Sequence, residues 1–154
     1  MVRRASAACV ILLAVLAAPL GAQTTTPTED SLKVAHQTVM SAITSGNPAM
    51  LVPMLDRSGV GFFRDSQAIV TFGAGYGPQE AIPSVLTDLA QFSVAEYDAV
   101  YRVVGATGVV CMAAQMQPKK GQKARYVRST WVYASLDGTW RLLSWHTSDA
   151  PLKK

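Results

Sequence analysis

Two hydrophobic periods divide the chain. In residues 32–43 the apolar positions recur at helical spacing, which predicts an amphipathic helix. Asp30 or Ser31 can cap the start of this helix, and Gly46 suits the left-handed backbone that commonly ends one. Pro48 cannot continue the preceding helix. A second short helix is predicted from this proline over residues 48–55, where Met50, Leu51, Met54 and Leu55 are apolar.

Further along the chain the hydrophobic period changes from helical to alternating. A strand is predicted over residues 60–65, after a turn at 56–59, and residues 68–72 can extend it as a hairpin. A third helix is predicted over residues 79–91. Four longer strands follow, at 93–104, 109–117, 124–136 and 139–147, and Asp137-Gly138 is a strong hairpin signal between the last two. Helices followed by an antiparallel meander indicate an α+β domain.

The first 22 residues have the order of a secretory signal peptide. A pair of arginines precedes the apolar run 7–18, and small residues up to Ala22 offer a cleavage site. The run is shorter than the roughly 20 residues that cross the hydrocarbon core of a membrane. We therefore expect export by a bacterial-type signal, to the periplasm or out of the cell. A polar leader over residues 23–30 and one domain over residues 31–154 would remain.

Removal of that segment changes the charge of the protein. The whole chain has 14 Lys+Arg and 10 Asp+Glu, and the loss of Arg3 and Arg4 leaves 12 against 10, so the net charge falls from +4 to +2. A balance so close to neutral gives no reason to expect a nucleic-acid partner. No other stretch is long and apolar enough to cross a membrane, so none is expected after cleavage.

The cysteines and histidines are too few and too scattered for a metal cluster. Cys111 is the only cysteine after residue 22, so no intramolecular disulfide can form. It alternates with Val109 and Ala113, which predicts a small buried apolar residue. His36 has no second ligand three or four positions away and is expected at the surface. No metal and no cofactor is predicted.

Short strings at both ends of the domain carry a family resemblance. They are Ala42-Ile43-Thr44-Ser45-Gly46-Asn47-Pro48, Gly77-Pro78-Gln79-Glu80-Ala81-Ile82, Thr130-Trp131-Val132-Tyr133, Asp137-Gly138-Thr139-Trp140-Arg141-Leu142 and His146-Thr147-Ser148. Together they resemble the nuclear transport factor 2-like superfamily, within it the SnoaL-like and calcium/calmodulin-dependent kinase association-domain-like branch. The resemblance implies a cone, in which a curved antiparallel sheet packs against three helices around a pocket. That fold serves enzymes, binding proteins and assembly modules alike.

Strict alternation sorts the strand residues into two faces. It places Trp140, Leu142, Ser144 and His146 on one face of the last strand, and Arg141, Leu143, Trp145 and Thr147 on the other. It likewise separates Val110, Met112, Ala114 and Met116 from Cys111 and Gln115, and Trp131 and Tyr133 from Thr130 and Val132. Both faces carry apolar bulk. One is expected to line the cone, and the other to bury against a second copy in a homodimer.

Two residues are candidates for acid–base chemistry. His146 lies near the end of the last predicted strand, where the resembled family often places a histidine at the rim of the pocket, and imidazole exchanges protons near neutral pH. Its alternative is a histidine that only fixes the C-terminal tail. Asp65 could match the proton-abstracting carboxylate of the ketosteroid-isomerase branch, or be an exposed carboxylate at a strand end. The tyrosine which that branch places on its first helix is Val39 here, so a complete catalytic set is lacking.

The sequence therefore supports two functions. The first is an exported pocket protein that binds a small apolar or amphipathic molecule. Its expected lining residues are Gln115, Trp131, Tyr133, Trp140 and His146. The alternative is a SnoaL-like or ketosteroid-isomerase-like enzyme with Asp65 or His146 as general base.

Overall fold

The computed structural model describes residues 26–62, 69–72, 87–119, 121 and 123–150. The predicted signal peptide and leader up to residue 25 therefore lie outside the described residues. So do Asp65 and most of the predicted third helix. Of that helix, residues 87–91 are described; residues 87–89 are helical and residues 90–91 form a turn, so the helical segment ends two residues before the predicted end. No helix in the described ranges is both long and apolar enough to span a bilayer.

The helical part begins two residues earlier than the sequence pattern predicts. Helix α1 runs from Glu29 to Ser45, and its N-cap is Thr28, whose hydroxyl accepts a hydrogen bond from the Ser31 amide while the Ser31 hydroxyl reaches back to Thr28. Gly46 ends the helix with φ 65°, as predicted. Helix α2 (Pro48–Leu51) and a single 3₁₀ turn (Val52–Met54) then lead into the sheet.

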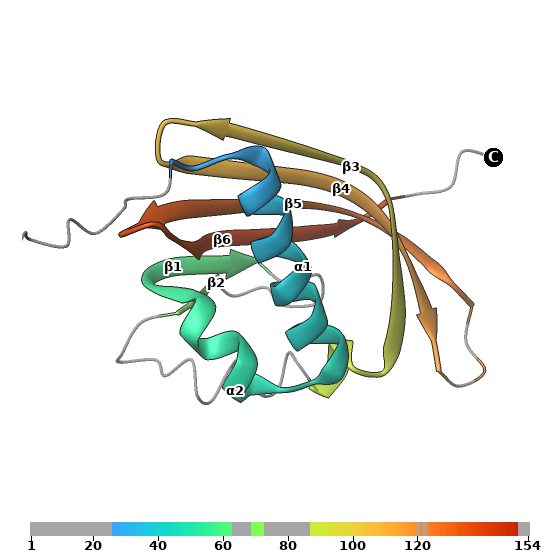
Figure 1. The fold of residues 1–154 in the computed structure, drawn as a ribbon. Coiled ribbons are helices and arrows are strands. Elements are labelled where there is room, and N and C mark those ends of the chain that lie inside the picture. Colours follow the sequence, from blue (N-terminus) through green and yellow to red (C-terminus); the bar gives the residue numbers. More distant parts are fainter. Residues whose placement is uncertain (1–25, 63–68, 73–86, 120, 122, 151–154) are drawn as a thin grey trace, which may run out of the picture.

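Six strands form one curved sheet, and α1 lies across its concave side (Figure 1). The strands are β1 (Leu55–Phe62), β2 (Ile69–Thr71), β3 (Phe92–Val104), β4 (Thr107–Pro118), β5 (Arg125–Leu136) and β6 (Thr139–Asp149). Their order is β2-β1-β6-β5-β4-β3, so β3 is one edge and β6 lies near the middle. The α+β architecture and the antiparallel β3–β6 meander agree with the sequence pattern.

Strand β1 differs from its prediction in start and in direction. It begins at Leu55, so residues 56–59 belong to the strand and do not form a turn before it. It pairs with β6 in parallel, whereas every other neighbouring pair is antiparallel. A Cβ on Gly59 would lie 2.8 Å from the Leu143 carbonyl oxygen, so this glycine lets β1 approach β6 closely.

The core lies between α1 and the concave face, which we call the inner face. Apolar residues at helical spacing on α1 meet alternate residues of β4, β5 and β6 there. The buried set includes Leu32, Val39, Ile43, Val110, Met112, Ala114, Val127, Trp131, Tyr133, Trp140, Leu142 and Trp145. At the α1 N-terminal end a Cβ on Gly108 would meet both Leu32 methyl carbons at 2.7 and 2.9 Å, so this glycine lets α1 pack closely on β4.

Two β-bulges decide which residues reach the inner face. In β3, Asp98 and Ala99 stand opposite the single residue Met112 of β4, and Asp98 has a positive φ of 55°. In β6, the pairing shifts between Ser144 and Leu142, so that Leu143 is the additional residue. Each extra residue reverses the alternation of the strand beyond it.

The β6 bulge overturns the predicted faces of the last strand. Trp140 and Leu142 face α1, as do Trp145 and Thr147 beyond the bulge, where the burial pattern changes phase. His146 therefore points to the opposite, outer face and is exposed. Strict alternation had put His146 with Trp140, because a bulge adds a residue that a single strand's sequence does not mark.

Candidate functional site

Helix α1 carries a histidine into the core. His36 is 0 % exposed and lies between Leu32 and Met40 on the buried side of the helix. The prediction that it is a surface residue is wrong. Its spacing contained the signal, because positions 32, 36, 39, 40 and 43 all fall on one helical stripe. The lack of a second metal ligand nearby does not indicate exposure, because His36 lies on the same side of the helix as the buried apolar residues.

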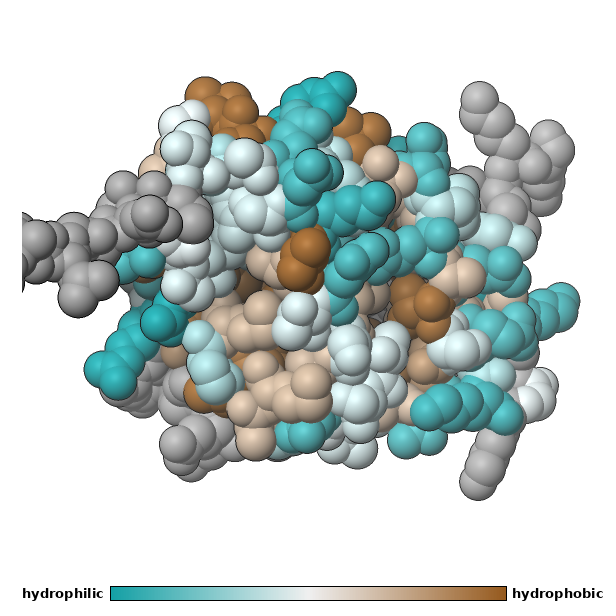
Figure 2. Space-filling view, in the orientation of Figure 1, coloured by the Kyte–Doolittle hydropathy of each residue, from teal (hydrophilic) through white to brown (hydrophobic). Residues whose placement is uncertain are grey.

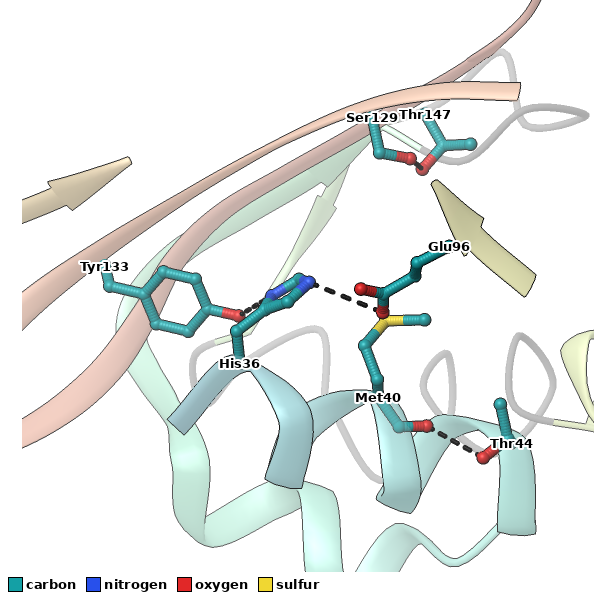
Figure 3. A network of polar contacts seen from close by, with 7 residues as sticks. All are labelled: His36, Met40, Thr44, Glu96, Ser129, Tyr133 and Thr147. Atoms are coloured by element: carbon teal, nitrogen blue, oxygen red, sulfur yellow. Dashed lines mark hydrogen bonds and ion pairs between the residues drawn. The ribbon is translucent and has the colours of Figure 1, made fainter. Parts of the chain in front are cut away.

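Four side chains of the inner face surround the imidazole of His36. The Tyr133 hydroxyl lies 2.8 Å from Nδ1, and Oε1 of Glu96 lies 3.7 Å from Nε2 (Figure 3). Trp131 and Tyr101 pack edge-on to the imidazole, with ring centroids 5.2 and 5.9 Å away. We call these five residues the His36 cluster. It joins α1 to β3 and β5, which are far apart in sequence.

Burial fixes the protonation of the central pair. Desolvation lowers the pKa of His36 to about 4, so the ring is neutral at pH 7 and its contact with Glu96 is not an ion pair. Burial also raises the pKa of Tyr133 well above its usual value, helped by Tyr101 and Glu96, so the phenol keeps its proton. The Tyr133 hydroxyl proton has no other acceptor among the described residues, so we assign Tyr133 as the donor to Nδ1. With this assignment the remaining proton of the neutral imidazole lies on Nε2, facing Glu96.

The β3 bulge brings Glu96 and Tyr101 to the same side of the sheet. They are five positions apart in the chain, so regular alternation would place them on opposite faces. With the extra residue, Glu96 pairs with Ala114 and Tyr101 with Val110, both on the inner face. Burial raises the pKa of the Glu96 carboxyl, and burial together with Glu96 raises that of Tyr101. The Glu96 side chain is still 26 % exposed, so the cluster reaches solvent at this carboxyl group.

Two buried nitrogen atoms of this cluster have no hydrogen-bond partner. They are Nε2 of His36 and Nε1 of Trp131, which are the unpaired buried side-chain nitrogens within the described part of the chain. A buried donor without an acceptor costs about 1–3 kcal/mol, and native folds contain few of them. A hydrogen-bond acceptor of another molecule would remove this cost. The two donors therefore mark a position where such an acceptor would add most to the free energy of binding.

A neighbouring tryptophan shows the contrast. Trp145 stacks on Trp131 with ring centroids 4.2 Å apart and planes inclined by 19°. Its indole N–H donates to the Thr147 hydroxyl at 2.7 Å, and that hydroxyl also lies 2.7 Å from the Ser129 hydroxyl (Figure 3). The same side chain in the same aromatic layer is thus satisfied in one case and unpaired in the other. Packing alone does not require Trp131 to lack a partner.

Comparison with solved structures identifies the fold of this chain, whereas comparison with sequence families does not. No family model matches the chain, and no curated protein matches it. Solved structures do match it. A nuclear transport factor 2-like protein from Cytophaga hutchinsonii superposes with a TM-score of 0.63 at 16 % identity, covering 80 % of this chain and 99 % of its own.

The chain has the nuclear transport factor 2-like fold. A candidate ketosteroid isomerase from Shewanella frigidimarina matches with a TM-score of 0.67 at 12 % identity, covering 83 % of this chain and 98 % of its own. The calcium/calmodulin-dependent protein kinase II hub of S. rosetta matches with a TM-score of 0.64 at 17 % identity, covering 79 % and 95 %. Identities this low establish the fold alone, and they confirm the fold that the sequence strings resemble.

Within this nuclear transport factor 2-like domain, the expected lining residues fall on both faces. Trp131, Tyr133 and Trp140 lie on the inner face, and the Trp140 indole N–H donates to the Ser31 hydroxyl of α1 at 2.9 Å. Gln115 lies on the outer face, since its neighbours Ala114 and Met116 are the buried residues of β4. The alternation predicted for β4 and β5 is confirmed.

Of the two acid–base candidates, the described residues include only His146. On the outer face, His146 meets Phe62 edge-on, with ring centroids 6.1 Å apart. The sheet separates it from the His36 cluster. Asp65 lies outside the described residues. Cys111, predicted to be buried, is exposed because it too belongs to the outer face of β4.

Among the described residues, neither a possible metal-binding group nor a surface depression adds a second site to the His36 cluster. No group of three His, Cys, Asp or Glu side chains that could hold a metal ion occurs among the residues that the structure describes. A surface depression of about 240 Å³ lies where β5 begins and β6 ends, lined by Ala124, Arg125, Tyr126, Asp149 and Ala150. It includes no member of the His36 cluster. The cluster is therefore the candidate functional site of this domain.

Proposed function

We propose that this is an exported protein that binds one small, mainly apolar molecule between α1 and the inner face, without an assigned reaction. The observation that carries the proposal is the pair of unpaired nitrogens in the His36 cluster, Nε2 of His36 and Nε1 of Trp131. The aromatic rings around them would contact the apolar body of the molecule, and these donors would hold its polar end. Export is supported by the sequence pattern of residues 1–22.

The outer face supports a second copy of the chain as partner. Large hydrophobic residues that are exposed on that face include Phe62 at 44 %, Tyr97 at 47 % and Val100 at 43 %. On the helix-bearing face, hydrophobic surface is broken into separate patches among polar side chains (Figure 2). We propose that two copies associate through their outer faces, since apolar residues on a sheet favour burial in an interface. Similarity to a kinase hub agrees with an assembling fold.

The enzyme alternative gains no support from the described residues. His146 would have to act from the outer face, away from the unpaired donors, and Asp65 lies outside the described residues. Binding requires only the contacts of the His36 cluster, so it is the function we put forward.

One experiment tests export, association and binding together. The full-length chain is expressed in its native host, purified from the exported fraction and examined by native mass spectrometry. We expect the mass of a chain without residues 1–22, a dimer, and an added non-covalent mass of one small molecule per chain. Trp131→Phe should retain less of that molecule than the matched control Trp145→Phe, because the Trp145 N–H is already bonded to Thr147.

Each part of this proposal can fail separately. Uncleaved protein in the cytoplasm would contradict export, and a monomer at micromolar concentration would contradict the dimer. Bare protein, together with no thermal shift across a panel of lipids and metabolites, would contradict binding.

A further inference from the structure

The His36 cluster offers hydrogen atoms and holds them in fixed positions. Tyr133 uses its proton on Nδ1 of His36, which leaves the Nε2 proton of His36 and the indole proton of Trp131 as donors. Both belong to side chains that are at most 1 % exposed. A bound molecule that satisfies them must bring a hydrogen-bond acceptor, such as a carbonyl or ether oxygen.

The charge of the cluster restricts which acceptor can enter. Among the described residues, the polar and aromatic side chains that meet the His36 ring are Glu96, Tyr101, Trp131 and Tyr133, and none of these four is a cation. Glu96 is the one carboxyl group among them, and it stands 3.7 Å from Nε2. A carboxylate or phosphate placed on these donors would therefore meet a like charge at close range, in surroundings poorer in water than bulk solvent.

We infer that this site selects neutral molecules that carry a hydrogen-bond acceptor and rejects anions of the same shape, with Glu96 as the residue that discriminates. The inference rests on the proposed binding function and adds the class of ligand to it. Glu96 lies on the edge strand β3 with its side chain partly exposed, so an arriving molecule meets its charge before the buried donors.

Three probes of matched shape test the inference. Acetophenone carries a neutral acceptor, benzoate replaces the methyl group by a charged oxygen, and α-methylstyrene replaces the acceptor by a methylene group. Their affinities are measured at about pH 8, where carboxyl groups are ionised, by ¹H–¹⁵N NMR of the tryptophan indole N–H resonances of the intact protein. We expect acetophenone to bind best and to shift the Trp131 resonance most. The other two should bind more weakly, α-methylstyrene by about threefold to tenfold and benzoate by at least about tenfold.

Matched variants identify the residues responsible. Glu96→Gln should raise the affinity for benzoate relative to acetophenone by about tenfold, whereas Asp137→Asn, which removes one charge at the β5–β6 turn, should leave that ratio unchanged. Trp131→Phe should remove the preference for acetophenone over α-methylstyrene, and Trp145→Phe should keep it. The measured quantity is a ratio of two affinities in the same variant. A general loss of packing weakens the binding of both probes and therefore leaves the ratio unchanged.

The outcomes separate the inference from the proposed function. Benzoate binding as tightly as acetophenone, or a benzoate ratio that Glu96→Gln does not change, would overturn the inference while leaving binding intact. Equal affinity for α-methylstyrene and acetophenone would overturn the role of the two donors. If none of the probes shifts any inner-face resonance up to its solubility limit, the binding proposal itself fails.

Discussion

His36 of α1 lies against the inner face of the sheet, and His146 of β6 projects from the outer face. The surroundings of the two side chains differ in almost every respect. His36 is fully buried, bonded to Tyr133 and neutral, with an unpaired nitrogen beside Glu96. His146 is exposed and packs only edge-on to Phe62 among the contacts described. The sequence favoured His146, because it sits where the resembled family often places a rim histidine. The comparison teaches that the face of the sheet determines whether a histidine is buried among polar partners or exposed. For His146 that face is set by the single extra residue Leu143 in β6.

A one-residue deletion in the regular part of β6 should break this comparison most strongly. Deletion of Arg141 makes Trp140 and Leu142 neighbours in the strand, so alternation must turn one of these two buried side chains to the outer face. We expect a loss of at least about 4 kcal/mol in the free energy of unfolding, comparable with truncation of a buried tryptophan. Guanidinium denaturation followed by tryptophan fluorescence measures it.

Deletion of Leu143 is the matched control for that deletion. It removes the extra residue of the bulge, so the shortened strand alternates regularly with Trp140, Leu142 and Trp145 on the inner face, and we expect a loss of about 1 kcal/mol from the half-buried side chain. If both deletions unfold at the same denaturant concentration, alternation does not set the faces of β6.

The dependence of stability on pH should sharpen the comparison through His36. His36 has a pKa of about 4 in the folded protein against an ordinary value of 6.5, so below pH 6.5 the unfolded chain binds its proton more readily. Its contribution to stability is complete above pH 6.5 and is lost as the pH falls toward 4, by about 3 kcal/mol. Glu96, whose pKa is raised, acts in the opposite sense in acid. Denaturation midpoints between pH 4 and pH 7 record the slope.

Two glutamine variants assign that slope to one residue. His36→Gln keeps a polar partner for Tyr133 but cannot take up the proton, so its stability should depend less on pH over this range. His146→Gln should keep the slope of the parent protein, because it leaves His36 and its buried partners unchanged on the other side of the sheet. The opposite result would place the pH-sensitive group on the outer face.

The β3 bulge should give the smallest effect. Asp98 has a positive φ of 55°, a conformation that aspartate tolerates and a β-branched residue does not. Asp98→Val should lower the free energy of unfolding by about 1–2 kcal/mol, and Asp98→Gly should change it by no more than about 0.5 kcal/mol. Ala95→Val, on the regular part of the same strand, is the control and should not destabilise. Equal losses for the two valine variants would show that the bulge conformation is not under strain.

The sequence by itself determined the local structure. Helical spacing and Gly46 set α1 and its end, and Asp137-Gly138 set the last hairpin, because both turn residues take positive φ, at 51° and 76°. Alternation set the faces of β4 and β5. These features depend on neighbours within a few residues, so a single sequence contains them.

Only the tertiary structure decided the site. The bulges in β3 and β6 appear when two strands are paired, because an extra residue is defined by the partner that it lacks. The parallel pairing of β1 with β6 likewise needs both strands in place. The His36 cluster joins residues 36, 96, 101, 131 and 133, and no spacing along the chain brings them together. Its chemistry follows from burial, which a helix acquires only when it packs on the sheet.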